Sequence, residues 1–114
     1  MEEKSVEWEG SSRTVVRGFP EGVRQDLGYA LMLVQRGEAP SDFKPLRGVG
    51  TGVYELRAQD GDAYRVIYIA RFEEAVYVLH AFKKKARKGI ATPRADLETA
   101  AKRLKAVEAR RRRG

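Results

Sequence analysis

The chain of 114 residues contains no cysteine and a single histidine, His80. Without cysteine it forms neither disulfide bonds nor cysteine-ligated zinc sites, and one imidazole cannot supply a multi-histidine metal centre. No stretch approaches the ~20 apolar residues that span a bilayer. The first ten residues, MEEKSVEWEG, are acidic and lack the apolar segment of a signal peptide. These absences predict a cytoplasmic protein that uses no metal or other cofactor and does not bind a membrane.

Apolar residues make up 42% of the chain and charged residues 34%, which is typical of a globular protein and not of a disordered one. A chain of this length fits one domain with a modest core. We therefore expect a single domain over residues 1–114, in which residues 110–114, with their four arginines, form a frayed basic tail.

Positive charge is concentrated at the C-terminal end. Residues 1–79 hold 10 Lys and Arg against 13 Asp and Glu, a net charge of −3, whereas residues 80–114 hold 13 against 3, a net charge of +10. Such asymmetry is typical of proteins that bind nucleic acid, an acidic partner or an anionic surface.

The hydrophobic pattern predicts strands and helices in the order β-α-α-β-β-β-α. The expected elements are an edge strand at 5–9, helices beginning near 12 and 20, strands at 53–57, 63–70 and 75–82, and a helix that begins near 93, with Thr92 as its N-cap. Residues 37–52, rich in Gly and Pro, are expected to form a loop. Short connections make the last three strands antiparallel. The prediction is an α+β domain: two N-terminal helices on a roughly four-stranded antiparallel sheet, followed by a C-terminal helix.

The densest charge, KKKARK at Lys83–Lys88, follows the most apolar strand directly. Closely spaced cations of this kind contact the phosphates that dominate nucleic-acid affinity. The alternative is a solvated loop that protects the edge of the sheet from aggregation. The basic surroundings favour the phosphate-binding interpretation.

Two arginines, Arg57 and Arg65, flank the Asp60-Gly61 turn and are expected to lie across from each other in a hairpin. Like charges in that position repel, so an anion bound between them is one interpretation. In the other, each arginine pairs with a carboxylate such as Glu55 or Asp62.

His80 and Phe82 are expected on one face of the last strand. His80 is a candidate general acid or base, because its unperturbed pKa lies near neutrality, although a lone histidine in an apolar strand is more often structural. Phe82, next to the lysines, is a candidate for stacking on a base, although aromatic residues in strands usually belong to the core.

Four segments carry a family resemblance: FKPLRGVGTGVYELR, DAYRVIYIA, VYVLHAFKKKARKGIATP and the basic, Leu-containing helix that follows. As an ordered set, they resemble toxins of type II toxin–antitoxin modules, and most closely the phage-derived, HigB-like branch of the RelE/ParE superfamily. The resemblance implies the RelE-like microbial RNase fold. It also implies metal-independent cleavage of mRNA on translating ribosomes, and neutralisation by a small antitoxin that is usually encoded beside the toxin. We expect the antitoxin of this chain to be a helix-turn-helix protein.

The resemblance also assigns candidate residues by their position in these motifs. Arg57, Arg65 and the lysines after Phe82 correspond to basic active-site residues of the family. The chemistry of RNA cleavage, which needs charge stabilisation and proton transfer but no protein nucleophile, makes the arginines candidate phosphate clamps and one lysine a candidate proton-transfer group. The candidate catalytic residues are Arg57, Arg65, Lys84, Lys85 and, in reserve, His80. The candidate RNA-binding residues are Lys83, Arg87, Lys88 and Phe82.

Two alternatives remain open from the sequence. The same fold also supports toxins that inhibit gyrase and have no nuclease chemistry. The charge asymmetry alone is also compatible with a non-catalytic nucleic-acid-binding domain.

Overall fold

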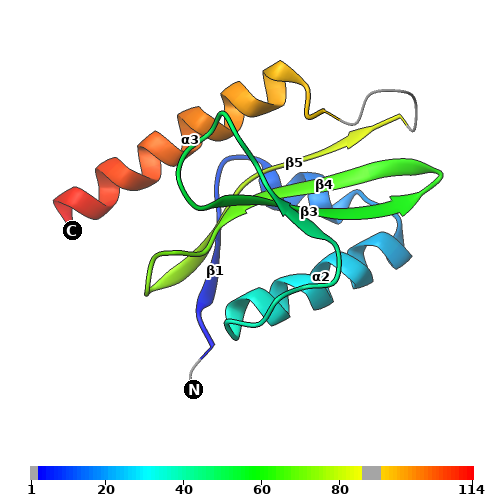
Figure 1. Ribbon diagram of the computed structural model, residues 1–114, viewed down its shortest axis with the longest axis horizontal. Helices are drawn as coiled ribbons and strands as arrows, with labels where there is room; N and C mark the ends of the chain where they lie inside the picture. The colour runs from blue at the N-terminus through cyan, green and yellow to red at the C-terminus, as the bar shows by residue number, and fades with distance from the viewer. Residues whose placement is uncertain (1–2, 86–90) are drawn as a thin grey trace.

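The computed structural model describes residues 3–85 and 91–114, which form one sheet with helices on both faces (Figure 1). In chain order the elements are β1 (Ser5–Trp8), α1 (Ser12–Arg17), α2 (Glu21–Gln35), β2 (Phe43–Pro45), β3 (Val53–Asp60), β4 (Asp62–Ile69), β5 (Ala75–Lys84) and α3 (Arg94–Arg113). The α+β class and the order of the predicted elements are confirmed, and β2 is an additional strand.

The sheet is mixed and five-stranded, with the order β1-β5-β4-β3-β2. The three long strands β3, β4 and β5 are antiparallel neighbours, as predicted. At one edge, however, β1 runs parallel to β5, with Ser5 opposite Ala75. The prediction of a purely antiparallel sheet is therefore wrong. Parallel pairing requires a long crossover connection, and the whole chain from α1 to β4 provides one here.

The opposite edge holds the strand that the sequence did not reveal. Residues 37–52 were expected to form a loop, but Phe43–Pro45 pairs with Tyr54–Leu56 of β3. Three residues are too few to show a period of two. A proline is tolerated in such a strand because one side of an edge strand forms no backbone hydrogen bonds to another strand.

On one face, α1 and α2 cover an apolar cluster. Val23, Leu27, Leu31 and Val34 of α2 are at most 6% exposed, and their spacing places them in one apolar stripe along the helix. They pack with side chains of β3, β4 and β5, among which Leu56 is fully buried.

On the other face lies α3, which the ribbon shows crossing the sheet on the side opposite α2 (Figure 1). Its residues Ala100, Leu104 and Val107 pack with Ile67 and Leu79 of the sheet, and all five are at most 3% exposed. Helices on both faces explain why β4 and β5 are almost continuously apolar.

The C-terminal end of α3 differs from its prediction. The helix continues to Arg113, so the frayed tail expected for residues 110–114 is a wrong prediction. Arg110 pairs with Glu9 at 2.8 Å and Arg111 with Glu74 at 2.6 Å, and these contacts tie the last turns of the helix to the sheet. Among the helices of the described ranges, none is long and apolar enough to cross a membrane.

Candidate functional site

The strand β5 continues into the lysine run. Lys83 lies opposite Tyr64 and Lys84 opposite Ala63, so β5 extends two residues beyond the predicted end of the strand at residue 82. Because side chains alternate along a strand, the two lysines point to opposite faces. Lys83 lies on the side of α1 and α2, beside Phe19, and pairs with Asp62 at 3.6 Å. Lys84 points to the face that α3 partly covers.

The hairpin of β3 and β4 places the two arginines as predicted. Arg57 lies directly opposite Arg65, and Gly61 makes the turn with a φ of +72°, a conformation that favours glycine. Both arginines also have a carboxylate partner. Arg57 Nε lies 3.5 Å from Asp42 Oδ1, and Arg65 Nε lies 3.7 Å from Glu55 Oε1.

Glu55, which the sequence indicated only as a possible ion-pair partner of the arginines, lies at the centre of the site and pairs with Arg65. Its carboxylate is only 1% exposed, and Thr92 Oγ1 donates a hydrogen bond of 2.7 Å to Glu55 Oε2. The hydroxyl of Thr92 is therefore not the predicted helix cap, and Pro93 occupies the N-cap position of α3. The sequence could have predicted an ion pair here, because an acidic residue at an inward position between Val53 and Arg57 needs a cationic partner when it is buried.

Two lysines complete the group around Glu55. Lys44 of β2 lies opposite Glu55 in the ladder, and Lys84 Nζ donates a hydrogen bond of 3.0 Å to the carbonyl of Ala91. Burial lowers the pKa of Lys84, and the nearby positive charge of Arg65 lowers it further. We name Lys44, Arg57, Arg65 and Lys84 the cationic cluster.

The cationic cluster holds more positive than negative charge. Burial lowers the pKa of Arg65, and Arg57 adds to this effect, whereas Glu55 opposes it. Of the polar side-chain atoms buried in the described residues, two lack a hydrogen-bond partner there: Glu55 Oε1 and Arg57 Nε. Four cations facing the carboxylates of Glu55 and Asp42 leave an attraction for an anion.

His80 lies away from the cationic cluster. In the ladder it is paired with Ile67, which separates it from Glu55. Its Nε2 lies 2.6 Å from Asp96 Oδ1, and its ring stacks on Phe82 at 5.6 Å between centroids. These contacts tie the start of α3 to β5, which agrees with a structural histidine.

Two of the remaining candidates, Phe82 and Lys85, differ in exposure. Phe82 is next to Arg65 in the ladder but is only 8% exposed and belongs to the apolar cluster under α3. Lys85 follows the end of β5 and is exposed. The candidates Arg87 and Lys88 lie outside the described residues. Within residues 3–85 and 91–114, no group of three or more histidine, cysteine, aspartate or glutamate side chains could hold a metal ion.

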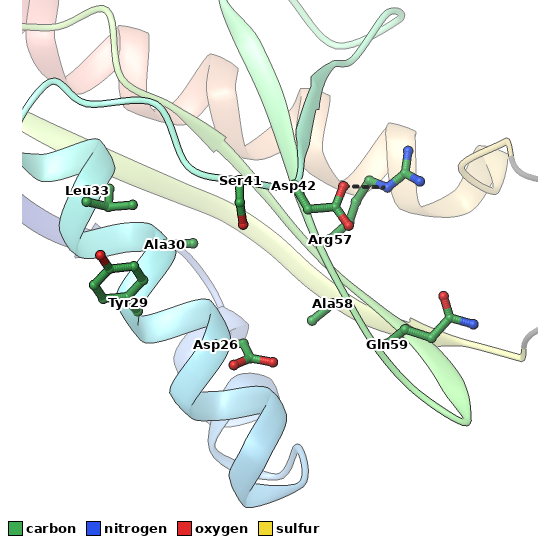
Figure 2. A pocket seen from close by; sticks show the side chains of 9 residues that line it. All are labelled: Asp26, Tyr29, Ala30, Leu33, Ser41, Asp42, Arg57, Ala58 and Gln59. Carbon is green, nitrogen blue, oxygen red and sulfur yellow. Dashed lines mark ion pairs between the residues drawn. The ribbon is translucent and has the colours of Figure 1, made fainter.

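A cavity of about 360 Å³ lies between α2 and β3, on the face of the sheet opposite the side chains of Arg57 and Arg65. Figure 2 shows Ala30 of α2 and Ala58 of β3 pointing toward one another across it. Arg57 and Asp42, joined by their ion pair, also line it. We name this space the edge cavity.

Two solved structures share the fold of this chain. The chain is similar to an arginine-to-alanine double mutant of the E. coli toxin RelE in the free state, with a TM-score of 0.59, 19% identity and coverage of 94% of this chain and 99% of that one. It is also similar to a chain of the intact E. coli RelBE toxin–antitoxin complex, with a TM-score of 0.56, 20% identity and coverage of 75% and 99%. The predicted RelE-like fold is thereby confirmed.

The family follows from the sequence itself. Residues 15–105 match the model of the family described as "Phage derived protein Gp49-like", and the chain belongs to this family. The predicted phage-derived branch is therefore confirmed. Among curated proteins, no sequence matches the chain.

Proposed function

We propose that this chain is the toxin of a type II toxin–antitoxin module and that it cleaves mRNA on translating ribosomes. The observation that carries the proposal is the cationic cluster, which gathers Lys44, Arg57, Arg65 and Lys84 around the buried Glu55. The fold is that of RelE, which is described as a toxin, and RelBE as a toxin–antitoxin complex. The chemistry of RNA cleavage explains why such a cluster is useful.

RNA carries its own nucleophile. The 2′-oxygen bonds to the adjacent phosphorus as the bond from phosphorus to the 5′-oxygen breaks, which gives a 2′,3′-cyclic phosphate and a 5′-hydroxyl end. The protein must orient the phosphate and stabilise the negative charge that builds up on it. Arg57 and Arg65 do this as phosphate clamps, held in place by Asp42 and Glu55.

Lys84 is the strongest candidate for proton transfer. Its lowered pKa favours the neutral amine, which takes the proton from the 2′-hydroxyl, while solvent supplies a proton to the departing 5′-oxygen. Lys83 and Lys85, together with Arg87 and Lys88, bind the phosphates of neighbouring nucleotides.

The proposed partner is an antitoxin encoded beside this chain, in the form of a small helix-turn-helix protein. The net charge of +10 on residues 80–114 suits an acidic segment of such a partner. Toxin, antitoxin and ribosome meet in the cytoplasm. A neighbouring reading frame for a helix-turn-helix protein would support this part of the proposal.

The test is to induce the wild type and the variant Arg65→Ala in a host without the antitoxin, and to map the 5′ ends of mRNA. Arg36→Ala is the matched control, because this arginine pairs with Glu3 on the surface, away from the cationic cluster. We expect the wild type and the control to arrest growth and to produce cuts in phase with codons, and Arg65→Ala to lose both effects.

Three other outcomes would contradict the proposal. Growth arrest with intact mRNA and altered DNA supercoiling would indicate a gyrase inhibitor. Harmless expression of the folded wild type would indicate a binding domain without toxicity. Cuts that persist in the folded Arg65→Ala variant would remove the cationic cluster from the chemistry.

A further inference from the structure

Two residues just before α3 tie this helix to the cationic cluster, on the face of the sheet opposite the edge cavity. The carbonyl of Ala91 accepts a hydrogen bond of 3.0 Å from Lys84 Nζ. Next to it, Thr92 Oγ1 donates a hydrogen bond of 2.7 Å to Glu55 Oε2. Because Thr92 precedes Pro93, its backbone is restricted to extended conformations, which limits the positions that its hydroxyl can take. The hydroxyl is therefore held at the buried carboxylate.

The carboxylate of Glu55 depends on this hydroxyl. It is 1% exposed, and in the described part of the chain it accepts no other hydrogen bond. Its second oxygen, Oε1, lies 3.7 Å from Arg65 Nε, which is too far for a hydrogen bond. A buried carboxylate without any donor is costly. Without the hydroxyl of Thr92, Glu55 would have to take its hydrogen bond from a nearby cation.

The guanidinium of Arg65 is the cation that such a change would affect most. Its Nε faces Glu55, and its Nη1 donates a hydrogen bond of 3.1 Å to the carbonyl of Tyr64. Its Nη2 forms no hydrogen bond or ion pair within residues 3–85 and 91–114, so this nitrogen is left for a phosphate. A carboxylate that moved closer would form a bidentate pair through Nε and Nη2. The group that clamps the phosphate would then be occupied.

We infer that Thr92 is a positioning residue of the cationic cluster: its hydroxyl satisfies Glu55 and so keeps Arg65 available to the scissile phosphate. This inference rests on the proposed function. A hydroxyl suits the task because it is a neutral donor. It gives the carboxylate a hydrogen bond without neutralising any of the positive charge that attracts the RNA.

The direct test is single-turnover cleavage of mRNA on programmed ribosomes by variants of Thr92. Thr92→Val replaces the hydroxyl by a methyl group of similar size, whereas Thr92→Ser keeps the hydroxyl. Thr99→Val is the matched control, because the hydroxyl of Thr99 bonds only to the carbonyl of Ala95 within α3. We expect Thr92→Val to cleave about tenfold more slowly, as loss of a hydrogen bond to a charged group does. Thr92→Ser and Thr99→Val should cleave at the wild-type rate.

The pH dependence of cleavage distinguishes positioning from a merely structural role. Burial lowers the pKa of Lys84, and the negative charge of Glu55 opposes this effect. A carboxylate that turns toward the cations raises this pKa, because it stabilises the charged amine and offsets the charge of Arg65. The rise of cleavage with pH should therefore move to higher pH in Thr92→Val and stay in place in Thr99→Val.

A variant without the carboxylate provides a second test. In a Glu55→Gln background no negative charge can turn toward Arg65, so adding Thr92→Val should neither slow cleavage further nor shift its pH dependence. This pair also covers the case in which Thr92→Val alone does not fold, because an amide costs less to bury than an unpaired carboxylate. Equal slowing by Thr92→Val in both backgrounds would show that Thr92 does not act through Glu55, and would overturn the inference.

The inference and the proposed function fail in different ways. If the wild type cuts mRNA and folded Thr92→Val cuts it at the same rate with the same pH dependence, the inference is wrong and the nuclease stands. If the wild type makes no cuts, the readout is the binding of a 2′-O-methyl RNA oligonucleotide, which cannot be cleaved. Affinity that falls about tenfold in Thr92→Val and is restored in Thr92→Ser would then support the positioning role without the nuclease. Equal affinity of the three proteins would overturn both.

Discussion

The face of the sheet under α3 has two halves that differ completely in chemistry, although the same three strands build both. In one half, Val53, Ile69 and Leu79 are at most 2% exposed and pack beneath α3. In the other half, the same strands carry Arg57, Arg65 and Lys84. The helix covers only the first half, so the second does not need to be apolar. The change from apolar to cationic along each strand therefore marks the site.

The largest effect on stability is expected in the apolar half. Leu79→Ala should lower the free energy of unfolding by about 2–5 kcal/mol, because it removes a fully buried side chain and leaves a cavity. Denaturant unfolding measures this loss. Cleavage per folded molecule should stay at the wild-type level. A large loss of cleavage by protein that remains folded would show that the two halves are not independent.

The largest effect on cleavage is expected in the cationic half. Arg65→Ala should slow cleavage about 10²–10³-fold, as removal of one stabilising donor typically does. It should also destabilise the fold, since Glu55 is left buried without its partner. The double variant Arg65→Ala with Glu55→Gln should recover stability but not cleavage. Recovery of cleavage in the folded double variant would contradict the role of Arg65 as a phosphate clamp.

Lys83 and Lys84 at the end of β5 point to opposite faces of the sheet, so variants of the two lysines compare the faces. Lys84→Ala should slow cleavage about 10²-fold, as loss of a general base does, whereas Lys83→Ala, on the opposite face, should have a smaller effect. Cleavage by the wild type should rise with pH until the amine of Lys84 is neutral. The lowered pKa moves this rise to lower pH than for an ordinary lysine. An unchanged pH profile in Lys84→Arg would contradict the assignment.

The smallest effect is expected where α3 is tied to the sheet. The hydrogen bonds from Arg111 lower the pKa of Glu74 from 4.5 to about 2. The stability that Glu74 contributes is therefore fully present above about pH 4.5 and is lost as the pH falls toward 2. Glu74→Gln should melt slightly below the wild type near neutral pH, and the difference in Tm should shrink over that window. A difference that does not change with pH would indicate that the ion pair contributes nothing.

The sequence predicts the fold well where long periodic segments dominate. The apolar stripe of α2 and the antiparallel order of β3, β4 and β5 follow from spacing and short turns. The parallel pairing of β1 with β5 does not, because it joins segments about 70 residues apart that carry no mutual signal. Nor does β2, whose three residues are too few for a pattern.

For the candidate site, local spacing reveals the hairpin but not its surroundings. The opposition of Arg57 and Arg65 could be predicted, since a short turn fixes the register. The role of Glu55 depends on Lys44, which lies in β2, and on Thr92, which lies just before α3. Lys83 and Lys84 point to opposite faces because β5 extends as far as Lys84. The pairing of β5 with β4 determines that length.

The most direct test of the central claim uses purified protein and ribosomes programmed with a defined mRNA, with the 5′ ends of the products read by primer extension. The wild type is compared with the Arg65→Ala/Glu55→Gln variant, which keeps the fold without the buried charge. We expect the wild type to cut the mRNA at the ribosome and the double variant to cut about 10²–10³-fold more slowly. Intact mRNA with folded wild-type protein, or equal cleavage by both proteins, would contradict the account.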